Sequence, residues 1–249
     1  MISEKADTQS PPTRPFLITF SGIDGAGKST QIERLTSRLH EQGLRVFRLS
    51  FWDDVAVWSN MRAGVGGRSV DFHLTDPATP QPFVPRNNKS VRKWYLSAAR
   101  SALYMLDVAR LRRILASQRI KSCDVVILDR YIYDQLANVY SESWAARTYG
   151  RILLMQTPAP DLAFVLDASP TAAFARKPEY PLEFMHRNRQ NFLRLQEIVP
   201  HLIIIPDAET EAVSSDIFSH IRRSRLVAGI PPEGKTDATA YSAVVPLQS

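Results

Sequence analysis

Cysteine is almost missing from this chain, whose 249 residues include only Cys123. A single thiol excludes a disulfide framework and suits a reducing compartment such as the cytoplasm. We expect Cys123, at the start of an apolar segment, to be a small buried residue. Long apolar runs are missing too, because none approaches the roughly 20 residues needed to cross a bilayer. The first residues also lack the apolar stretch of a secretory signal, so the sequence predicts a cytoplasmic protein without a membrane span.

Blocks of lysine and arginine are lacking as well, although the net charge is +6, from 31 basic and 25 acidic residues. The basic side chains are spread along predicted helices, and they do not alternate with aromatic residues as in proteins that bind single-stranded nucleic acids. The charge pattern therefore disfavours a nucleic-acid partner and suits an enzyme whose ligands carry several phosphates. The apolar content of 44% is typical of a globular domain.

What the chain does contain is a phosphate-binding loop, between an apolar segment at 16–20 and an amphipathic helix pattern at 28–42. Residues 21–30 read SGIDGAGKST and fit the pattern G-x-x-x-x-G-K-[ST]. Glycines allow the tight turn that points backbone N–H groups at a phosphate, and the helix N-terminus adds positive potential. The lysine can reach the β/γ-phosphates of ATP, and the serine hydroxyl can bind Mg²⁺. The predicted ATP-binding residues are Gly22, Asp24, Gly25, Ala26, Gly27, Lys28, Ser29 and Thr30.

Strand and helix patterns alternate through the rest of a domain expected over 15–228. Five apolar segments have the form of parallel strands covered on both faces; they are 16–20, 45–51, 124–129, 162–167 and 201–206. Between them lie helix patterns at 28–42, 91–117, 182–198 and 210–226. The alternation predicts an α/β fold with a three-layer, doubly wound, parallel five-stranded sheet of the P-loop NTPase type. Ligands are then expected beyond the carboxyl ends of the strands.

Three stretches stand outside this alternation. We expect 1–14 and 229–249 to be flexible arms, because they combine proline with polar residues and show no periodicity. Glycines and prolines across 63–90 predict an ordered insertion loop beside a second substrate.

The strand end at Asp129 and Arg130 favours a kinase over other phosphate-loop proteins. Neither this end nor the one at Asp167 carries the second acid with which hydrolases orient water, and the guanine-reading pattern Asn-Lys-x-Asp is missing. Arg130 offers a planar fork to an anionic acceptor, and Asp129 can orient metal-bound water. An ordinary surface ion pair is the alternative. The position at the end of a buried strand favours phosphoryl transfer, with Ser29 and Asp129 serving the metal.

Segments 20–31, 126–137 and 160–170 resemble the thymidylate kinases, which are nucleoside monophosphate kinases of the P-loop class. Their order and spacing are kept over about 15–225. The resemblance implies ATP as the donor with Mg²⁺, a nucleoside monophosphate (foremost dTMP) as the acceptor, and a homodimer. It gives catalytic roles to Lys28, Asp129, Arg130 and an arginine of a short lid around 174–182.

Since position 26 is alanine, the lid has to supply the cation that stabilises the moving phosphoryl group. The candidates are Arg176 and Lys177, whereas Arg187 and Arg189 are expected on the solvated face of a helix. The resemblance implies that Asp24, Arg130 and Tyr131 bind the acceptor. The predicted acceptor-binding residues also include five at or near positions where the chain departs from the family, namely Trp52, Asp53, Arg100, Arg110 and Asp134.

The acceptor side departs from the family pattern. Asp53 or Asp54 stands where the family has a glutamate, Val108 replaces an arginine that packs on the base, and Asp134 replaces a serine. Trp52 could stack on a base or pack in the core. These differences leave open a P-loop kinase for another small acceptor, such as a nucleoside or another phosphate. They also leave open an ATP-binding regulatory protein without turnover and, third, a nucleic-acid-dependent ATPase.

Overall fold

The structure is a computed structural model that describes residues 14–57, 94–139 and 144–224. The insertion loop expected at 63–90 lies outside the described residues. So do the two expected arms, apart from Arg14, and the domain bounds therefore stay a prediction.

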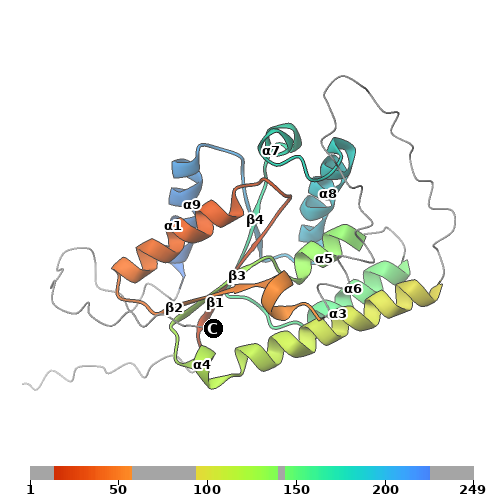
Figure 1. Ribbon diagram of the computed structural model, residues 1–249, viewed down its shortest axis with the longest axis horizontal. Helices are drawn as coiled ribbons and strands as arrows, with labels where there is room; N and C mark the ends of the chain where they lie inside the picture. Colours follow the sequence, from red (N-terminus) through yellow and green to blue (C-terminus); the bar gives the residue numbers. More distant parts are fainter. Residues whose placement is uncertain (1–13, 58–93, 140–143, 225–249) are drawn as a thin grey trace, which may run out of the picture.

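Five parallel strands form a single sheet in the order β2-β3-β1-β4-β5 (Figure 1). The strands are β1 (Phe16–Ser21), β2 (Val46–Ser50), β3 (Val125–Asp129), β4 (Leu162–Leu166) and β5 (Leu202–Ile205). Each predicted strand is confirmed to within one residue at either end. The strand order changes direction at β1, which lies between β3 and β4, and such a switch point is where open α/β sheets bind ligands.

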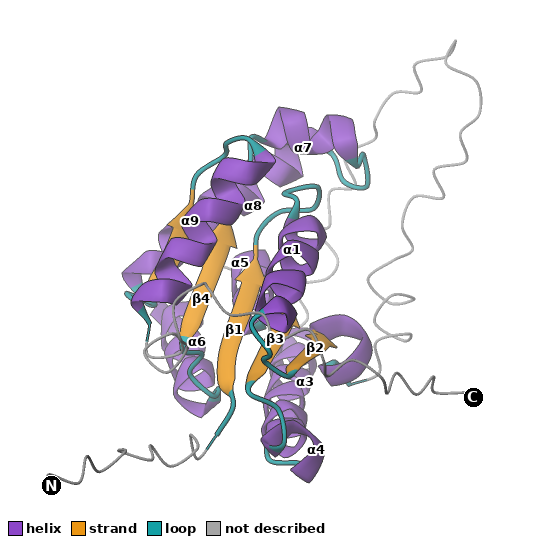
Figure 2. Cartoon of the chain, turned by 90° about the vertical axis from the view of Figure 1, so that its left-hand side faces the viewer, coloured by secondary structure: helices purple, strands orange, loops and turns teal. Residues whose placement is uncertain are grey.

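Helices cover both faces of the sheet (Figure 2). On one face, Ile18 and Phe20 of β1 pack with Ile32 of α1 (Lys28–Glu41) and Ile217 of α9 (Thr210–Arg223). Because side chains alternate along a strand, Leu17 belongs to the core on the other face. That face is covered by α3 (Trp94–Leu115), α5 (Ile132–Val139), α6 (Trp144–Gln156) and α8 (Leu182–Arg194). The three-layer α/β fold is thus confirmed.

Short elements complete the described chain. They are the π-helical turn η1 (Phe51–Val55), α4 (Gln118–Lys121), α7 (Pro170–Arg176) and the 3₁₀ turn η2 (Leu195–Glu197). The helix expected over 182–198 therefore tightens at Leu195 instead of continuing as α-helix. No helix in the described ranges has the length and apolar character that crossing a membrane requires.

The expectation for Cys123 is wrong, because the side chain is only half-buried. It lies in the turn between α4 and β3, before the covered part of the strand begins. Its Sγ donates a hydrogen bond to the carbonyl oxygen of Arg119 at 3.4 Å.

Candidate active site

The loop between β1 and α1 is shaped by glycines with positive φ. Gly22, Gly25 and Gly27 have φ values of 136°, 79° and 84°, which L side chains rarely adopt. Two of them also approach other backbone closely. A Cβ at Gly22 would lie 2.7 Å from the carbonyl oxygen of Leu166, and one at Gly25 would lie 2.5 Å from that of Ala173. The loop is therefore seated between the end of β4 and helix α7.

Lys28 lies inside this loop. Its Nζ donates hydrogen bonds to the carbonyl oxygens of Gly22 and Ile23, both at 2.9 Å, and its side chain is buried. The pKa of Lys28 is lowered from 10.5 to about 8, mainly by burial and also by the charge of Arg130, while nearby carboxylates act in the opposite direction. Ser29, in contrast, is exposed on the first turn of α1, as is the next residue, Thr30.

Arg130 directly follows β3, and its side chain contacts the same loop. Its guanidinium pairs with Asp24 of the loop through Nη2 and with Asp134 of α5 through Nη1, the latter at 3.2 Å. The backbone of Arg130 has a φ of 67°, the sole positive value outside glycine in the described ranges. Its N–H donates to the carbonyl oxygen of Phe20 at 2.8 Å. Strained residues of this kind gather at functional sites, and here the strain aims a cation at the phosphate loop.

Asp134 is buried beneath Arg130. Its carboxylate accepts hydrogen bonds from the Ser21 hydroxyl at 2.6 Å and from the backbone N–H of Tyr131 at 3.0 Å. Burial raises the pKa of Asp134, whereas the positive charges of Arg130 and Lys28 act in the opposite direction. Ser21 went unassigned in the sequence, although its place between the first strand and the first glycine marked it as a residue of this edge.

Asp129 ends β3 with its side chain half-buried. Within the described ranges its carboxylate has no hydrogen-bond partner, and it lies close enough to Lys28 and Arg130 to act on the pKa of both. No group of three metal-ligating side chains occurs among the residues the structure describes. The Ser29 hydroxyl and the Asp129 carboxylate nevertheless suit Mg²⁺, which is commonly held by few protein ligands together with substrate phosphates.

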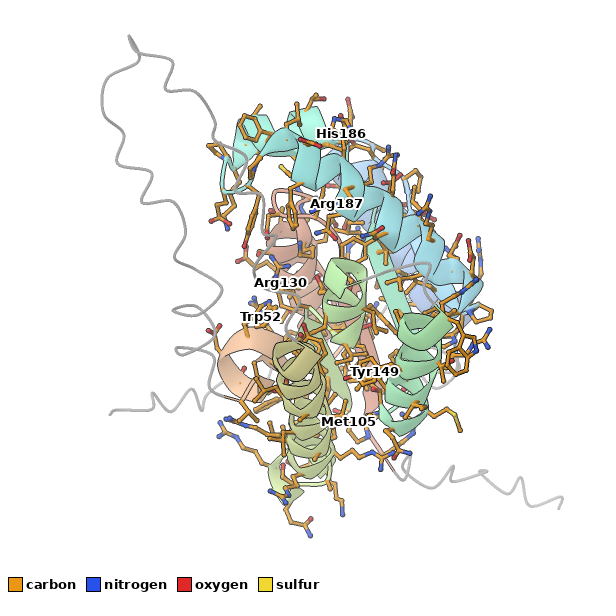
Figure 3. The ribbon with its side chains drawn as sticks, turned by 90° about the vertical axis from the view of Figure 1, so that its right-hand side faces the viewer. Trp52, Met105, Arg130, Tyr149, His186 and Arg187 are labelled. Carbon is orange, nitrogen blue, oxygen red and sulfur yellow. The ribbon has the colours of Figure 1, made fainter. Side chains whose placement is uncertain are left out.

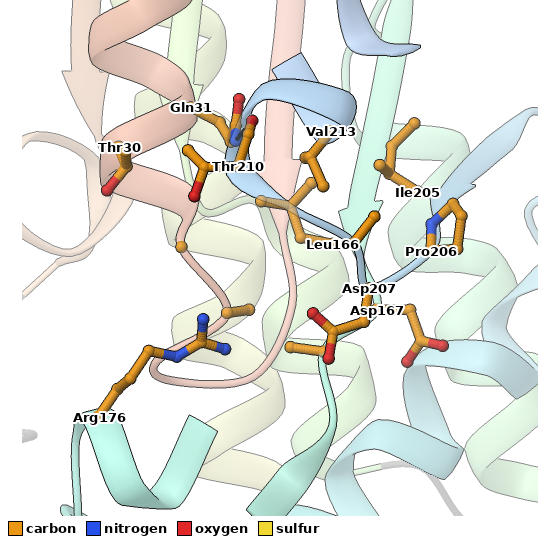
Figure 4. A pocket seen from close by; sticks show the side chains of 14 residues that line it. Thr30, Gln31, Leu166, Asp167, Arg176, Ile205, Pro206, Asp207, Thr210 and Val213 are labelled. Carbon is orange, nitrogen blue, oxygen red and sulfur yellow. Dashed lines mark hydrogen bonds between the residues drawn. The ribbon is translucent and has the colours of Figure 1, made fainter. Parts of the chain in front are cut away.

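A pocket of about 220 Å³ opens beside the loop (Figure 4). Ala26 and Gly27 form one wall, and the ends of β4 and β5 form the opposite one. Arg176, the last residue of α7, also lines the pocket and is exposed. The predicted lid arginine thus lies beside the phosphate loop. Gln31, unassigned in the sequence, lines the pocket too and donates through Nε2 to the carbonyl oxygen of Thr210 at 2.9 Å.

The two arginines of α8 differ in their surroundings. Arg187 is exposed over the ring of Phe184, so its expected solvated position is confirmed. For Arg189 that expectation is wrong, because its Nε and Nη2 donate to Asp167 at 2.5 and 2.8 Å. This side of α8 faces the end of β4, where Asp167 lines the pocket. Of the other lid candidates, Lys177 pairs at the surface with Glu179 at 3.0 Å.

Tyr180, in the link between α7 and α8, is a further residue that the sequence analysis missed. Its ring packs against Phe184 with centroids 5.1 Å apart. Burial raises the pKa of Tyr180, and the nearby charge of Asp24 adds to the rise. The link that was expected to form a lid therefore lies close to the phosphate loop.

The predicted acceptor residues that follow β2 lie in η1. The Ser50 hydroxyl donates to Asp53, and the Ser50 N–H donates to Asp54, both at 2.7 Å, so the two carboxylates cap this turn. Trp52 is half-buried and meets Phe51 edge-on, with centroids 5.9 Å apart. Because Ser50 lies beside Asp129 in the sheet, Trp52 and Arg130 follow neighbouring strand ends (Figure 3). The acceptor roles of Trp52 and Asp53 stay predictions.

Of the other predicted acceptor residues, one is buried in the core and two belong to helix α3. Tyr131 is fully buried, and its hydroxyl donates to the carbonyl oxygen of Pro158. Arg110 is exposed on α3, while Val108 is buried in the core. The side chain of Arg100 lies outside the described part of the chain. Their acceptor roles also stay predictions.

Comparison with known proteins points to a single family, although no family profile matches the chain. The chain is 28% identical to a probable thymidylate kinase of Pyrococcus abyssi over 226 residues, which cover 86% of this chain and 98% of that protein. It is 27% identical to the thymidylate kinase of Chlorobaculum parvum over 250 residues, 88% of this chain and 100% of that one. It is 29% identical to the thymidylate kinase of Bifidobacterium longum over 225 residues, 83% and 97% of the two chains. With this similarity along most of its length, a parallel five-stranded sheet and a P-loop, the chain is a divergent homologue of the thymidylate kinases.

Proposed function

We propose that this protein is an ATP-dependent nucleoside monophosphate kinase that converts dTMP to dTDP. One observation carries the proposal: the guanidinium of Arg130 is held against the phosphate loop by Asp24, on the side of the loop where Lys28 lies. In a hydrolase an added arginine acts on the transferring phosphoryl group, whereas in a kinase a cation held at the loop can also neutralise an anionic acceptor. The relatives named thymidylate kinase match over nearly their full length, which supports the same conclusion.

On the donor side, the loop N–H groups and Lys28 would bind the ATP phosphates. The adjoining pocket has apolar walls at Leu166, Ile205 and Val213, which suit a purine base. Ser29 and Asp129 would hold Mg²⁺, which when bound neutralises phosphate oxygens. Arg176 would supply the lid cation for the transferring phosphoryl group.

On the acceptor side, the phosphate of the incoming nucleotide would compete with Asp24 for Arg130. A phosphate dianion accepts a bidentate pair of hydrogen bonds from a guanidinium, so it can displace a single carboxylate. The acceptor phosphate would then be fixed near the γ-phosphate by Arg130. Catalysis by such positioning needs no covalent intermediate on the enzyme.

An acceptor screen with matched lysine variants tests this function. We expect Mg²⁺-dependent formation of ADP that dTMP stimulates more than other nucleoside monophosphates, thymidine or sugar phosphates. Lys28→Ala should lower kcat/KM by about 10²-fold or more, since it removes a cation from the phosphates. Lys121→Ala, an exposed lysine at the end of α4, is the control and should leave turnover unchanged. Turnover with thymidine but not dTMP would favour a nucleoside kinase, and tight ATP binding without turnover would favour the regulatory alternative.

We also propose that the protein is a homodimer that pairs through α3 and α6. These helices pack together (Figure 3). They also expose a set of large apolar side chains, which are Leu106, Trp144, Ile152 and Met155. The three residues on α6 recur at spacings of a helical face, and Trp144 and Met155 are 80% and 78% exposed. Soluble monomers rarely leave such a stripe uncovered, and a two-fold pairing would cover it on both chains.

A further inference from the structure

Asp134 joins three parts of the site through one buried carboxylate. Its Oδ2 accepts hydrogen bonds from the hydroxyl of Ser21, the last residue of β1, and from the N–H of Tyr131. Its Oδ1 accepts from Nη1 of Arg130 at 3.2 Å. The Asp134 side chain is 3% exposed, so a ligand in the site could not touch it.

The partners of Asp134 differ in what they require of it. A neutral oxygen would satisfy the Ser21 hydroxyl and the Tyr131 N–H. The guanidinium of Arg130 is the partner that gains from a full negative charge, because charge-assisted hydrogen bonds are roughly twice as strong as neutral ones. A buried carboxylate is costly unless it is paired, so its presence here points to Arg130.

The two carboxylates that hold Arg130 are not equivalent. The Asp24 side chain is 17% exposed and belongs to the phosphate loop, so a ligand that enters the loop can reach it. Asp134 is enclosed, and both of its oxygens are occupied by fixed donors. An incoming phosphate can therefore replace Asp24 but not Asp134.

We propose that Asp134 is a positioning residue that holds Arg130 through Nη1 and leaves Nη2 to exchange Asp24 for the acceptor phosphate. Arginine has many rotamers, and fixing one of them before the acceptor arrives saves ordering entropy on binding. The positive φ of Arg130 fixes the direction in which its side chain leaves the backbone. The hydrogen bond from Nη1 to Asp134 fixes the position of its guanidinium. This inference rests on the proposed function, because it assigns Arg130 to the acceptor.

The central test is Asp134→Asn in the full chain. The amide keeps the shape but has one acceptor oxygen, so its NH₂ group must face either Arg130 or the N–H of Tyr131. We expect the KM for dTMP to rise about 10-fold, from loss of a hydrogen bond to a charged group. Asp134 does not line the ATP pocket, but its charge also acts on Lys28. The Kd for a non-hydrolysable ATP analogue should therefore rise by less than the KM for dTMP, about threefold at most. Equal losses of ATP and dTMP affinity would show a merely structural role and overturn the proposal.

A double-mutant cycle shows whether Asp134 acts through Arg130. In an Arg130→Ala background, Asp134→Asn should raise the KM for dTMP no further, because the group it positions is gone. An additional increase of the same size as in the wild-type background would contradict the proposal. If Asp134→Asn does not fold, Ser21→Ala replaces it in the cycle. That variant removes one of the two hydrogen bonds to Oδ2 of Asp134, and we expect a smaller rise of about threefold that also disappears without Arg130.

The same measurements separate this proposal from the proposed function. If the wild-type protein shows no dTMP-dependent turnover, the function itself is wrong and the positioning role falls with it. If dTMP is turned over but Arg130→Ala leaves the KM for dTMP unchanged, the function stands, and the acceptor role of Arg130 and the positioning role of Asp134 are wrong. If Arg130→Ala impairs dTMP use while Asp134→Asn and Ser21→Ala leave it unaffected, the function stands and the positioning role alone is wrong.

Discussion

At the scale of single residues, Lys28 shows how a binding group can weaken the fold that carries it. Its ammonium is buried in the phosphate loop, where two backbone carbonyls are its hydrogen-bond acceptors. The fold therefore holds a partly desolvated positive charge, and the lowered pKa of about 8 measures the cost. Bound phosphates would relieve this cost, so the charge matters for the ligand and not for the apoprotein.

This cost predicts that Lys28→Met stabilises the ligand-free protein at pH 7. The unfolded side chain has a pKa of 10.5 and the folded one a pKa of about 8, so the penalty is complete below pH 8. Between the two values the unfolded state binds more protons, and rising pH relieves the penalty. We expect a gain of about 1–3 kcal/mol in the free energy of unfolding at pH 7, shrinking toward pH 10.5. Urea unfolding at pH 7 and pH 9.5 measures it.

Lys121→Met, at an exposed site, is the control for that experiment and should match the wild-type protein in stability at both pH values. A Lys28→Met protein less stable than wild type at both pH values would contradict the prediction. It would mean that the hydrogen bonds to the loop carbonyls outweigh the desolvation of the charge.

The position of a site residue could be predicted from the sequence when the residue directly follows a strand or its loop, because parallel strands end at the same edge of the sheet. Lys28 and Arg130 follow strands that lie side by side, so their meeting at one edge needed only the parallel sheet. Arg189 could not be placed this way, because its contact with Asp167 depends on how α8 is rotated against β4. Its place in the sequence likewise did not show that Asp134 is buried and contacts Arg130 from the protein interior, away from the side open to a ligand.

At the scale of elements, the phosphate loop and α7 are in direct contact. The backbone of Gly25 approaches the carbonyl oxygen of Ala173, and Arg176 lies one turn further along the same helix. The position of the lid arginine therefore depends on a residue of the loop that has no side chain.

A pair of glycine variants tests this dependence. Gly25 and Gly43 have φ values of 79° and 77°, but a Cβ at Gly43 would meet nothing within 4 Å. Alanine at Gly43 should lower the free energy of unfolding by about 1–2 kcal/mol through backbone strain, and alanine at Gly25 should lower it by more, since its Cβ also clashes with Ala173. Only Gly25→Ala should also raise the KM for ATP, about 10-fold, because α7 must move away from the loop. Equal ATP kinetics in the two variants would show that α7 adapts without cost.

The strands were the elements that the sequence predicted best, because long apolar segments between turns admit few other structures. The helix starts at Lys28, Leu182 and Thr210 were predicted, whereas the 3₁₀ turn at Leu195 and the turn after β2 were not. The π-helical turn η1 depends on Asp53 and Asp54 bonding back to Ser50, a local competition for hydrogen bonds that composition does not reveal.

At the scale of the whole molecule, the apolar stripe on α6 is the surface through which we propose that two chains associate. Ile152→Glu should place a charge in the middle of the proposed interface and convert the dimer to a monomer, since a buried unpaired charge is strongly unfavourable. Light scattering coupled to size-exclusion chromatography measures the mass. Arg222→Glu, at an exposed position of α9 on the opposite face of the sheet, is the control and should leave the mass unchanged. A wild-type protein that elutes as a monomer at micromolar concentration would exclude this interface.

The single cysteine of the sequence has a practical consequence for testing whether the lid at α7 moves when nucleotide binds. Cys123 sits at the amino ends of the strands, across the sheet from the phosphate loop. A fluorophore attached there would report from a fixed reference point without disturbing nucleotide chemistry. Lys177→Cys at the exposed end of α7 would add a second attachment site. Energy transfer between the two dyes could then follow lid closure in real time, with no native cysteine to remove.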